Sequence, residues 1–260
     1  MPGPDFELPR ARILVTNDDG IHAPGIEVLE RIARSLGDDV WTVAPDVEQS
    51  GAAHSLTLRR PLRVRKVADR RFSVNGTPTD CALLAINHIL KNRRPDLVLS
   101  GVNGGANLGE DVTYSGTIAA AMEATLLGVP SIALSQVNRG AGEPPFAIAE
   151  RHAAEVIRRL VSVSWPLGVL MNVNFPDTSG GPVGGFRVGR QGRRISTIEL
   201  IEGRDPKGRS YIWIGDFTSD ETAEPGTDLD AVMHGAIAVT PLHLDLTHDP
   251  SLALLRDLFP

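Results

Sequence analysis

The feature that most constrains the fold of this chain is the alternation of short β-branched runs with amphipathic stretches over its first two thirds. Residues 13–16 form an apolar run that ends in a polar turn, as buried strands do, and residues 25–36 then carry apolar side chains at helical spacing. Repeated β–α units with short connections predict a parallel sheet with right-handed crossovers. We therefore expect an α/β fold with a Rossmann-like, doubly wound, mostly parallel sheet.

The same patterns predict the remaining elements of this sheet and a change of character after Pro176. Further strands are expected at 40–44, 97–100, 131–135 and 169–174, a hairpin at 62–67 and 71–74, and helices at 77–90, 115–127 and 146–163. Beyond a glycine-rich loop, alternating segments at 186–188, 196–201 and 211–214 predict a β-rich arm, followed by a returning strand at 232–240 and a terminal helix at 252–259.

We divide the chain into three parts on this basis. Residues 1–10 are expected to be a disordered extension, residues 11–185 a Rossmann-like catalytic domain, and residues 186–260 a β-rich arm, returning strand and helix that serve oligomerisation. An isolated hairpin with apolar side chains is marginal in water and invites association. The apolar residues expected to be exposed on the arm are Ile195, Ile198, Leu200, Ile201, Tyr211, Ile212, Trp213 and Ile214.

Charge and composition exclude several classes of partner. The net charge of −6 disfavours binding to a nucleic acid duplex. No stretch is long enough to cross a bilayer, and the N-terminus lacks the basic and apolar regions of a signal peptide, so we expect no membrane association. The single cysteine, Cys81, excludes an internal disulfide and fits a cytoplasmic location. It is interpreted as a small apolar helix residue rather than a catalytic thiol.

Two adjacent carboxylates, Asp18 and Asp19, follow the first predicted strand. Ligands of an open parallel sheet bind at the carboxyl ends of its strands. Adjacent carboxylates repel each other unless a cation or a proton lies between them. A helix cap or an Asx turn is the plainer interpretation, but it needs only one Asp. The pair therefore favours a metal site.

Polar residues also follow two other predicted strands that end at the same edge of the sheet. The loop after the second strand contains Asp46 and Ser50, and the loop after the strand at 97–100 contains Asn103. Oxygen atoms of Asp, Ser and Asn suit Mg²⁺, Mn²⁺ or Ca²⁺, and the histidines lack the paired spacing of a zinc site. His22 and His54 lie near this edge, where either is a substrate contact or a solvated loop residue.

Two further segments have the character of phosphate-binding loops. The glycine-rich segment 101–109 is weak evidence for dinucleotide binding, because that fingerprint follows the first strand of the sheet. Residues 114–117, with the sequence Tyr-Ser-Gly-Thr, open a predicted helix. Amide and hydroxyl groups at a helix N-terminus can hold a phosphate, and a plain Ser or Thr cap is equally compatible with this sequence.

In combination, these residues resemble the SurE family, the survival protein E nucleotidases. The resemblance runs in chain order from Arg12 over nearly the whole chain, and its specificity comes from many short motifs occurring together. The motifs are Asn17-Asp18-Asp19-Gly20, Ala23-Pro24-Gly25, Val43-Ala44-Pro45-Asp46, Gln49-Ser50-Gly51, Gly76-Thr77-Pro78-Thr79-Asp80-Cys81, Ser100-Gly101-Val102-Asn103, Tyr114-Ser115-Gly116-Thr117, Asn172-Val173-Asn174-Phe175-Pro176, Gly226-Thr227-Asp228 and Thr240-Pro241-Leu242.

The resemblance implies hydrolysis of nucleoside 5′- and 3′-monophosphates and, in some members, of short polyphosphate. It implies one divalent metal ion per subunit, with Mg²⁺ or Mn²⁺ favoured, and a homodimer or homotetramer with exchanged C-terminal segments. The implied metal ligands are Asp18, Asp19, Ser50 and Asn103, and the implied substrate-binding residues are Asn107, Ser115, Gly116 and Thr117. The chain departs from the family pattern at its N-terminal extension and at Ala53-His54.

The expected chemistry is metal-assisted hydrolysis, in which Asp18 or Asp19 acts as the general base or the nucleophile. Two alternatives remain open. An aspartyl phosphatase of the haloacid dehalogenase type expects an Asp-x-Asp spacing, which the adjacent carboxylates do not match. A nucleotide-binding protein without catalysis would keep the fold and the phosphate-binding helix without needing Asp18, Asp19 and Ser50 together.

Overall fold

The computed structural model describes residues 2–137, 146–178, 180–193, 196–219 and 223–259. Its main sheet contains β1 (Arg12–Thr16), β2 (Asp39–Pro45), β3 (Val64–Ala68), β4 (Arg71–Val74), β5 (Leu97–Asn103), β6 (Ser131–Gln136), β7 (Val169–Phe175), β8 (Phe186–Val188) and β11 (Ile237–His243). The helices are α1 (Pro24–Arg34), α2 (Pro78–Leu84), α3 (Gly116–Leu126), α4 (Ala147–Val161), α5 (Asp228–Met233) and α6 (Asp249–Leu258). A π-helical turn, Ala85–Ile89, continues α2, and short 3₁₀ turns occur at Leu8–Arg10 and Gly109–Thr113.

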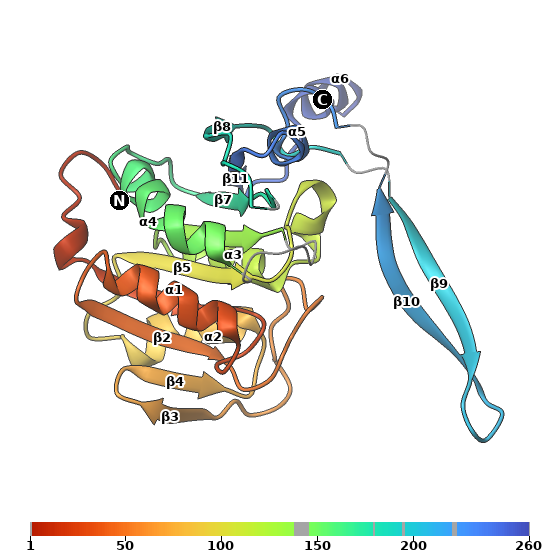
Figure 1. The fold of residues 1–260 in the computed structure, drawn as a ribbon, viewed down its shortest axis with the longest axis horizontal. Coiled ribbons are helices and arrows are strands. Elements are labelled where there is room, and N and C mark those ends of the chain that lie inside the picture. The colour runs from red at the N-terminus through yellow and green to blue at the C-terminus, as the bar shows by residue number, and fades with distance from the viewer. Residues whose placement is uncertain (1, 138–145, 179, 194–195, 220–222, 260) are drawn as a thin grey trace.

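The strands of the main sheet follow the order β3-β4-β2-β1-β5-β6-β7-β11-β8 (Figure 1). The pairings from β4 through β2, β1, β5 and β6 to β7 are all parallel. Strand β3 is antiparallel to β4, and β11 is antiparallel to β7 and parallel to β8. The expected α/β class and mostly parallel sheet are confirmed.

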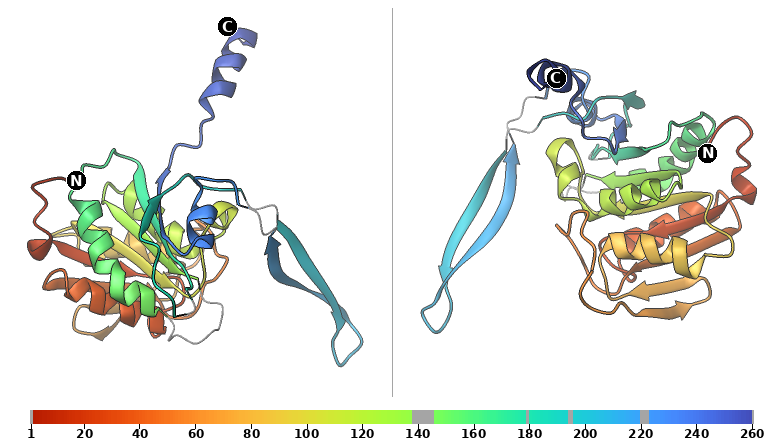
Figure 2. Two further views of the ribbon diagram at one scale, coloured as in Figure 1. Left: turned by 45° about the horizontal axis from the view of Figure 1, so that its top comes forward. Right: turned by 180° about the vertical axis from the view of Figure 1, so that it is seen from behind.

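Helices cover both faces of this sheet, as a doubly wound fold requires. Successive side chains of a strand point to opposite faces, and on β1 Ile13 and Val15 pack with α1 and α4, whereas Leu14 packs with α2 and α3. In Figure 1, α1 lies in front of the sheet, and Figure 2 shows α2 on the face seen from behind. Burial on both faces explains why these strands are continuous apolar runs.

The N-terminal segment packs against the body, which differs from the disordered extension expected from its polar composition. The amide of Gly3 donates to the carbonyl of Val161 at 3.0 Å. Leu8 is buried and joins the core cluster that contains α1 and α4. Local composition did not reveal this packing because the contacts are made with residues far along the chain.

The main sheet extends across the boundary drawn at residue 185, because β8 and β11 are two of its strands. The prediction of a strand at 232–240 was wrong for residues 232–236. Val232 belongs to α5, which Thr227 caps by accepting from the amide of Asp230 at 3.3 Å, and β11 begins after a turn at Gly235 with φ +69°. The pattern misled because a buried helix end and a buried strand form one apolar run.

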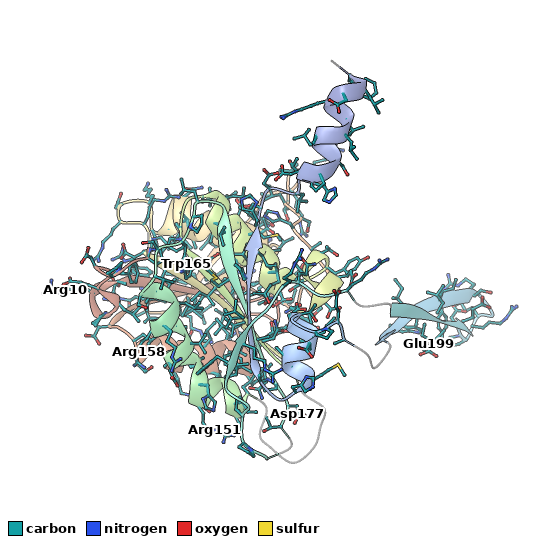
Figure 3. The ribbon with its side chains drawn as sticks, turned by 90° about the horizontal axis from the view of Figure 1, so that it is seen from above. Arg10, Arg151, Arg158, Trp165, Asp177 and Glu199 are labelled. Carbon is teal, nitrogen blue, oxygen red and sulfur yellow. The ribbon has the colours of Figure 1, made fainter. Side chains whose placement is uncertain are left out.

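Strands β9 (Ser196–Arg204) and β10 (Ser210–Ser219) form a separate antiparallel hairpin that reaches away from the body (Figures 1 and 2). Figure 3 shows Glu199 of this arm far from the main sheet. The described apolar side chains of the arm are exposed: Leu200, Ile201, Tyr211, Ile212, Trp213 and Ile214. Ile195 and the side chain of Ile198 lie outside the described residues.

Helix α6 also stands apart from the body (Figure 2). Its side chains Leu254, Leu255 and Leu258 are exposed, as is Phe259 at its end. Within the described part of the chain, no helix has the length and apolar character needed to cross a membrane.

Candidate active site

The turn after β1 presents Asp18 and Asp19 at the carboxyl edge of the sheet. The buried side chain of Asn17 closes this turn, because its Oδ1 accepts from the amide of Gly20 at 3.2 Å and its Nδ2 donates to the Gly20 carbonyl at 3.0 Å. Gly20 has φ +105°, a conformation that side-chain-bearing residues rarely adopt. Asn17 and Gly20 therefore build the turn, and the two carboxylates are left for the site.

Asp18 is buried against the N-terminus of α3. Thr117 Oγ1 donates to Asp18 Oδ1 at 2.5 Å, and the amide of Thr117 also donates to this carboxylate. A Cβ atom on Gly116 would lie 2.6 Å from Asp18 Cβ, so only a residue without a side chain allows this approach. Because a helix N-terminus favours negative charge, α3 stabilises the Asp18 carboxylate.

The electrostatic environment disfavours two full negative charges in the turn. Burial raises the pKa of Asp18, and hydrogen bonds from Thr117 oppose this rise. Burial, together with the charges of Asp18 and Glu48, raises the pKa of Asp19 to about 6. Either a proton or a bound cation would relieve this repulsion.

The loop after β2 brings Ser50 and Glu48 to the same edge. The amide of Gln49 donates to the carbonyl of Asp18 at 2.8 Å, which ties this loop to the Asp18 turn. Ser50 Oγ donates to Glu48 Oε1 at 2.8 Å. Glu48 is a site residue that was not predicted from the sequence. Its only signal was an acidic residue two positions before Ser50 in a loop expected at the site.

Asn103 lies at the end of β5, the strand beside β1. Its Nδ2 donates to the carbonyl of Gly105 at 2.9 Å, and no hydrogen bond between Asn103 and Asp18 or Asp19 occurs among the described residues. The side-chain nitrogen of Asn103 is thus bonded to the protein. The side-chain oxygen, Oδ1, is the atom of Asn103 that can bind a cation.

Asn107 is buried and held from two neighbouring strands. Its amide donates to Asn174 Oδ1 at 2.8 Å, and its Nδ2 donates to Ser135 Oγ at 2.7 Å. Its carbonyl accepts from Asn172 Nδ2 at 2.8 Å. These bonds set the path of the loop that follows β5. Asn172 and Asn174 belong to the motif Asn172-Val173-Asn174-Phe175-Pro176, whose pattern alone does not predict this role.

Ser115 caps α3, because its Oγ accepts from the amide of Ile118 at 3.1 Å. A hydroxyl that accepts one bond still has a proton to donate. Asp228 is buried and accepts from the amides of Gly109 at 3.0 Å and Gly192 at 2.7 Å. Asp228 thereby ties the loop beside the site to the start of the arm.

The two histidines near the site have different surroundings. His22 is exposed on the loop after the Asp18 turn. The Nε2 atom of His54 lies 3.0 Å from Oε2 of Glu123 on α3, so His54 faces this helix.

The donor set fits a hard divalent cation only as a mixed site. Among the described residues, no group of three or more His, Cys, Asp and Glu side chains could hold a metal ion. Two crowded carboxylates, one hydroxyl and one amide carbonyl are nevertheless oxygen donors of the kind that Mg²⁺ and Mn²⁺ take. The fit therefore depends on Ser50 and Asn103 as well as on Asp18 and Asp19.

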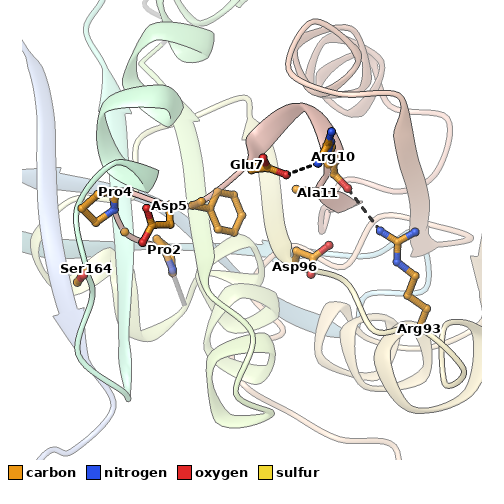
Figure 4. A pocket seen from close by; sticks show the side chains of 11 residues that line it. Pro2, Pro4, Asp5, Glu7, Arg10, Ala11, Arg93, Asp96 and Ser164 are labelled. Carbon is orange, nitrogen blue, oxygen red and sulfur yellow. Dashed lines mark hydrogen bonds and ion pairs between the residues drawn. The ribbon is translucent and has the colours of Figure 1, made fainter.

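A cavity of about 690 Å³ lies at the opposite, amino edge of the sheet, beneath the N-terminal segment (Figure 4). Its arginines are already paired. Arg10 Nη1 donates to Glu7 Oε2 at 2.9 Å, and Arg93 Nη2 donates to the Arg10 carbonyl at 3.4 Å. This cavity contains none of the residues expected at the site.

Comparison with known proteins decides the family. The family model described as survival protein SurE matches residues 13–197. The chain belongs to the SurE family. The resemblance inferred from the motifs is thereby confirmed.

SurE relatives match over almost the whole chain. The 5'-nucleotidase SurE of Paramagnetospirillum magneticum is 57% identical over 248 residues, which is 95% of each chain. The 5'-nucleotidase SurE of Rhodospirillum rubrum is 53% identical over 262 residues, the full length of both. The crystal structure of the SurE protein from Aquifex aeolicus has a TM-score of 0.82 and 40% identity, and the match covers 95% of this chain and 99% of that one.

Proposed function

We propose that this SurE family member is a divalent-metal-dependent phosphatase that hydrolyses nucleoside monophosphates. The observation that carries the proposal is the pair of adjacent carboxylates after β1, with Asp18 bonded to the N-terminus of α3 and Asp19 beside Asp18 and Glu48, so that the pKa of both carboxyls is raised. The relatives from P. magneticum and R. rubrum are named 5'-nucleotidases, which supports nucleoside 5′-monophosphates as substrates.

In this proposal, Asp18, Asp19, Ser50 and Asn103 hold one Mg²⁺ or Mn²⁺ ion. A bound cation of this kind polarises a phosphoryl oxygen and makes water a better nucleophile. Asp18 is fixed by the hydroxyl and amide of Thr117 and so supplies a rigid oxygen. The Ser50 hydroxyl donates its proton to Glu48, and this leaves the lone pairs of Ser50 Oγ for the metal ion.

Asp19 is the better of the two carboxylates for the role of general base. It is less buried than Asp18, whose carboxylate already accepts from the hydroxyl and the amide of Thr117. Asp18 is committed to Thr117 and serves as a ligand. We therefore assign proton transfer from the attacking water to Asp19.

The substrate phosphate would be held at the edge formed by α3 and the loop after β5. Ser115 has a hydroxyl proton to donate, and Gly116 exposes its backbone without a side chain in the way. Asn107 is held rigidly by β6 and β7. Thr117 contributes through Asp18, because its hydroxyl proton is already donated there.

In this proposal, Asn107, Ser115 and Gly116 bind the phosphoryl group and not the sugar. We therefore extend the proposal to nucleoside 3′-monophosphates and to short polyphosphate, as the resemblance to the family implies. Discrimination between these substrates would then come from residues outside the phosphate contacts.

The test is phosphate release from 5′-AMP, 3′-AMP and tripolyphosphate by the full-length protein. EDTA should abolish release, and Mn²⁺ or Mg²⁺ should restore it. The Asp19→Asn variant serves as the matched inactive control. Release that EDTA does not affect would contradict the metal, and a protein that releases phosphate from neither nucleotide would contradict the activity.

The proposal includes a homodimer or homotetramer and a cytoplasmic location. The exposed apolar side chains of β9, β10 and α6 support self-association, because such surfaces are seldom left in water. Light scattering measures the assembly, and cell fractionation measures the location.

A further inference from the structure

The loop that carries Ser50 is linked to α3 by a hydrogen bond between His54 and Glu123, outside the proposed metal and phosphate contacts. His54 Nε2 lies 3.0 Å from Glu123 Oε2. The His54 side chain is 33% exposed, whereas that of Glu123 is only 8% exposed. The two side chains connect the loop after β2 to the helix whose first turn holds Asp18.

The buried carboxylate of Glu123 favours the packing of the loop against α3. A carboxyl group that is removed from water is costly unless a hydrogen-bonding or charged partner accompanies it. His54 supplies that partner from the loop after β2. The loop must therefore pack against α3 for the Glu123 carboxylate to keep its hydrogen bond. A solvated loop histidine would make no such contact.

The backbone around His54 is held in an unfavourable conformation. Ala53 has φ +50°, in the left-handed region that residues with a side chain avoid. Its amide donates to the carbonyl of Tyr114 at 3.2 Å, directly before the first turn of α3. The contact of Ala53 with Tyr114, before α3, and the contact of His54 with Glu123, on α3, therefore hold the loop in place.

The loop is also anchored beyond His54. Thr77 Oγ1 donates to the carbonyl of Ser55 at 2.7 Å, and the amide of Thr57 donates to Asp80 Oδ1 at 3.0 Å. At its other end, Gln49 is bonded to Asp18. Ser50 lies between these anchors, and the segment after it is held by the bond of Ala53 to Tyr114 and by the contact of His54 with Glu123 of α3.

We propose that His54 and Glu123 form a tether that sets the position of Ser50 relative to Asp18. His54 is thus a positioning residue and not a substrate contact. The tether rests on the proposed function in one respect, the assignment of Ser50 to the metal ion. Its effect on the loop is independent of that assignment.

The experiment uses the full-length protein with the variants His54→Ala, His54→Gln and Glu123→Gln. His88→Ala is the matched control, because His88 is an exposed histidine on the turn after α2. Two quantities are measured: the affinity for Mn²⁺ alone by electron paramagnetic resonance, and amide hydrogen exchange of residues 49–57 without metal.

For His54→Ala we expect loop exchange to accelerate and Mn²⁺ affinity to fall about tenfold, the lower range for groups that support metal ligands. Glu123→Gln should change both quantities in the same direction by less. His54→Gln carries an amide nitrogen near the position of Nε2 and should restore most of both. His88→Ala should match wild type.

Unchanged loop exchange in His54→Ala would overturn the tether. Faster exchange with unchanged Mn²⁺ affinity would overturn the positioning of Ser50. If wild type binds no Mn²⁺, the proposed metal site fails, and the exchange measurement still decides whether the tether exists.

Discussion

Thr117 Oγ1 donates to Asp18 Oδ1 at 2.5 Å, across 99 residues of sequence. This hydrogen bond joins the first turn of α3 to the turn after β1 and orients the carboxylate proposed to bind the metal. It also uses the hydroxyl proton that the sequence analysis had assigned to the substrate phosphate.

Thr117→Val should weaken Mn²⁺ affinity and phosphate release by about 10- to 100-fold, because groups that orient metal ligands typically contribute this much. Thr117→Ser keeps the hydroxyl and should retain most of both. Isothermal titration with Mn²⁺ and a phosphate-release assay measure the effects. Equal affinity in the valine and serine variants would contradict the role of the hydroxyl.

Ser115→Ala should weaken handling of the phosphate while leaving Mn²⁺ affinity nearly intact. The lost bond to a charged group is expected to cost roughly 1.5–3 kcal/mol. Inhibition by inorganic phosphate, compared with wild type, measures this loss. If phosphate inhibits the variant as strongly as wild type, Ser115 is only the helix cap seen in its bond to Ile118.

Asp19→Asn should abolish metal-dependent turnover and stabilise the metal-free protein at neutral pH. The pKa of Asp19 is raised from 3.8 to about 6, so between these values the folded state holds a proton that the unfolded state has lost. Stability therefore falls as pH rises through this window, and the cost is fully present only well above pH 6.

Removing this charge should raise stability at pH 7 by on the order of 1 kcal/mol, or roughly 2–4 °C in Tm, after allowance for solvent screening. At pH 4 the two proteins should melt alike. Thermal melts in EDTA at both pH values measure this difference. A variant that melts below wild type at pH 7 would contradict the cost of burying the Asp19 charge beside Asp18 and Glu48.

Gly116→Ala should disrupt the site without unfolding the protein. The added carbon would lie 2.6 Å from Asp18 Cβ, so the Asp18 turn must move. We expect Mn²⁺ affinity to fall by at least about tenfold, as for other losses of ligand orientation. In the control Gly104→Ala, the added carbon meets only the Phe146 ring at 3.7 Å, and affinity should be preserved. Equal effects of both variants would contradict the steric argument.

Shortening the arm should yield a smaller assembly that still binds metal. Ser196 and Ser219 are register partners at the base of the hairpin, so residues 197–218 can be replaced by a two-residue turn. Removal of the exposed surface around Ile212, Trp213 and Ile214 takes away the apolar contacts expected to join subunits. Light scattering measures the mass, and a monomeric intact protein at micromolar concentration would contradict the proposed oligomer.

The sequence by itself determined the fold class, most strands and helices of the main sheet, and the family. Buried parallel strands and their covering helices leave local patterns, as residues 13–16 and 25–36 do, and these patterns need no partner to be recognised. Adjacent carboxylates after a strand also mark the site edge, because the topology of a parallel sheet brings the strand ends together.

Only the tertiary structure decided how the side chains of the site are used. It directed Thr117 to Asp18, buried Asn107 beneath Asn174, placed Glu48 beside the two aspartates and turned His54 to Glu123. These partners are separated in sequence by tens of residues, so no local pattern encodes them. A carboxylate, an amide or an imidazole satisfies its hydrogen bonds with whatever the packed fold brings near, and that choice is made only when the sheet order and helix positions are complete.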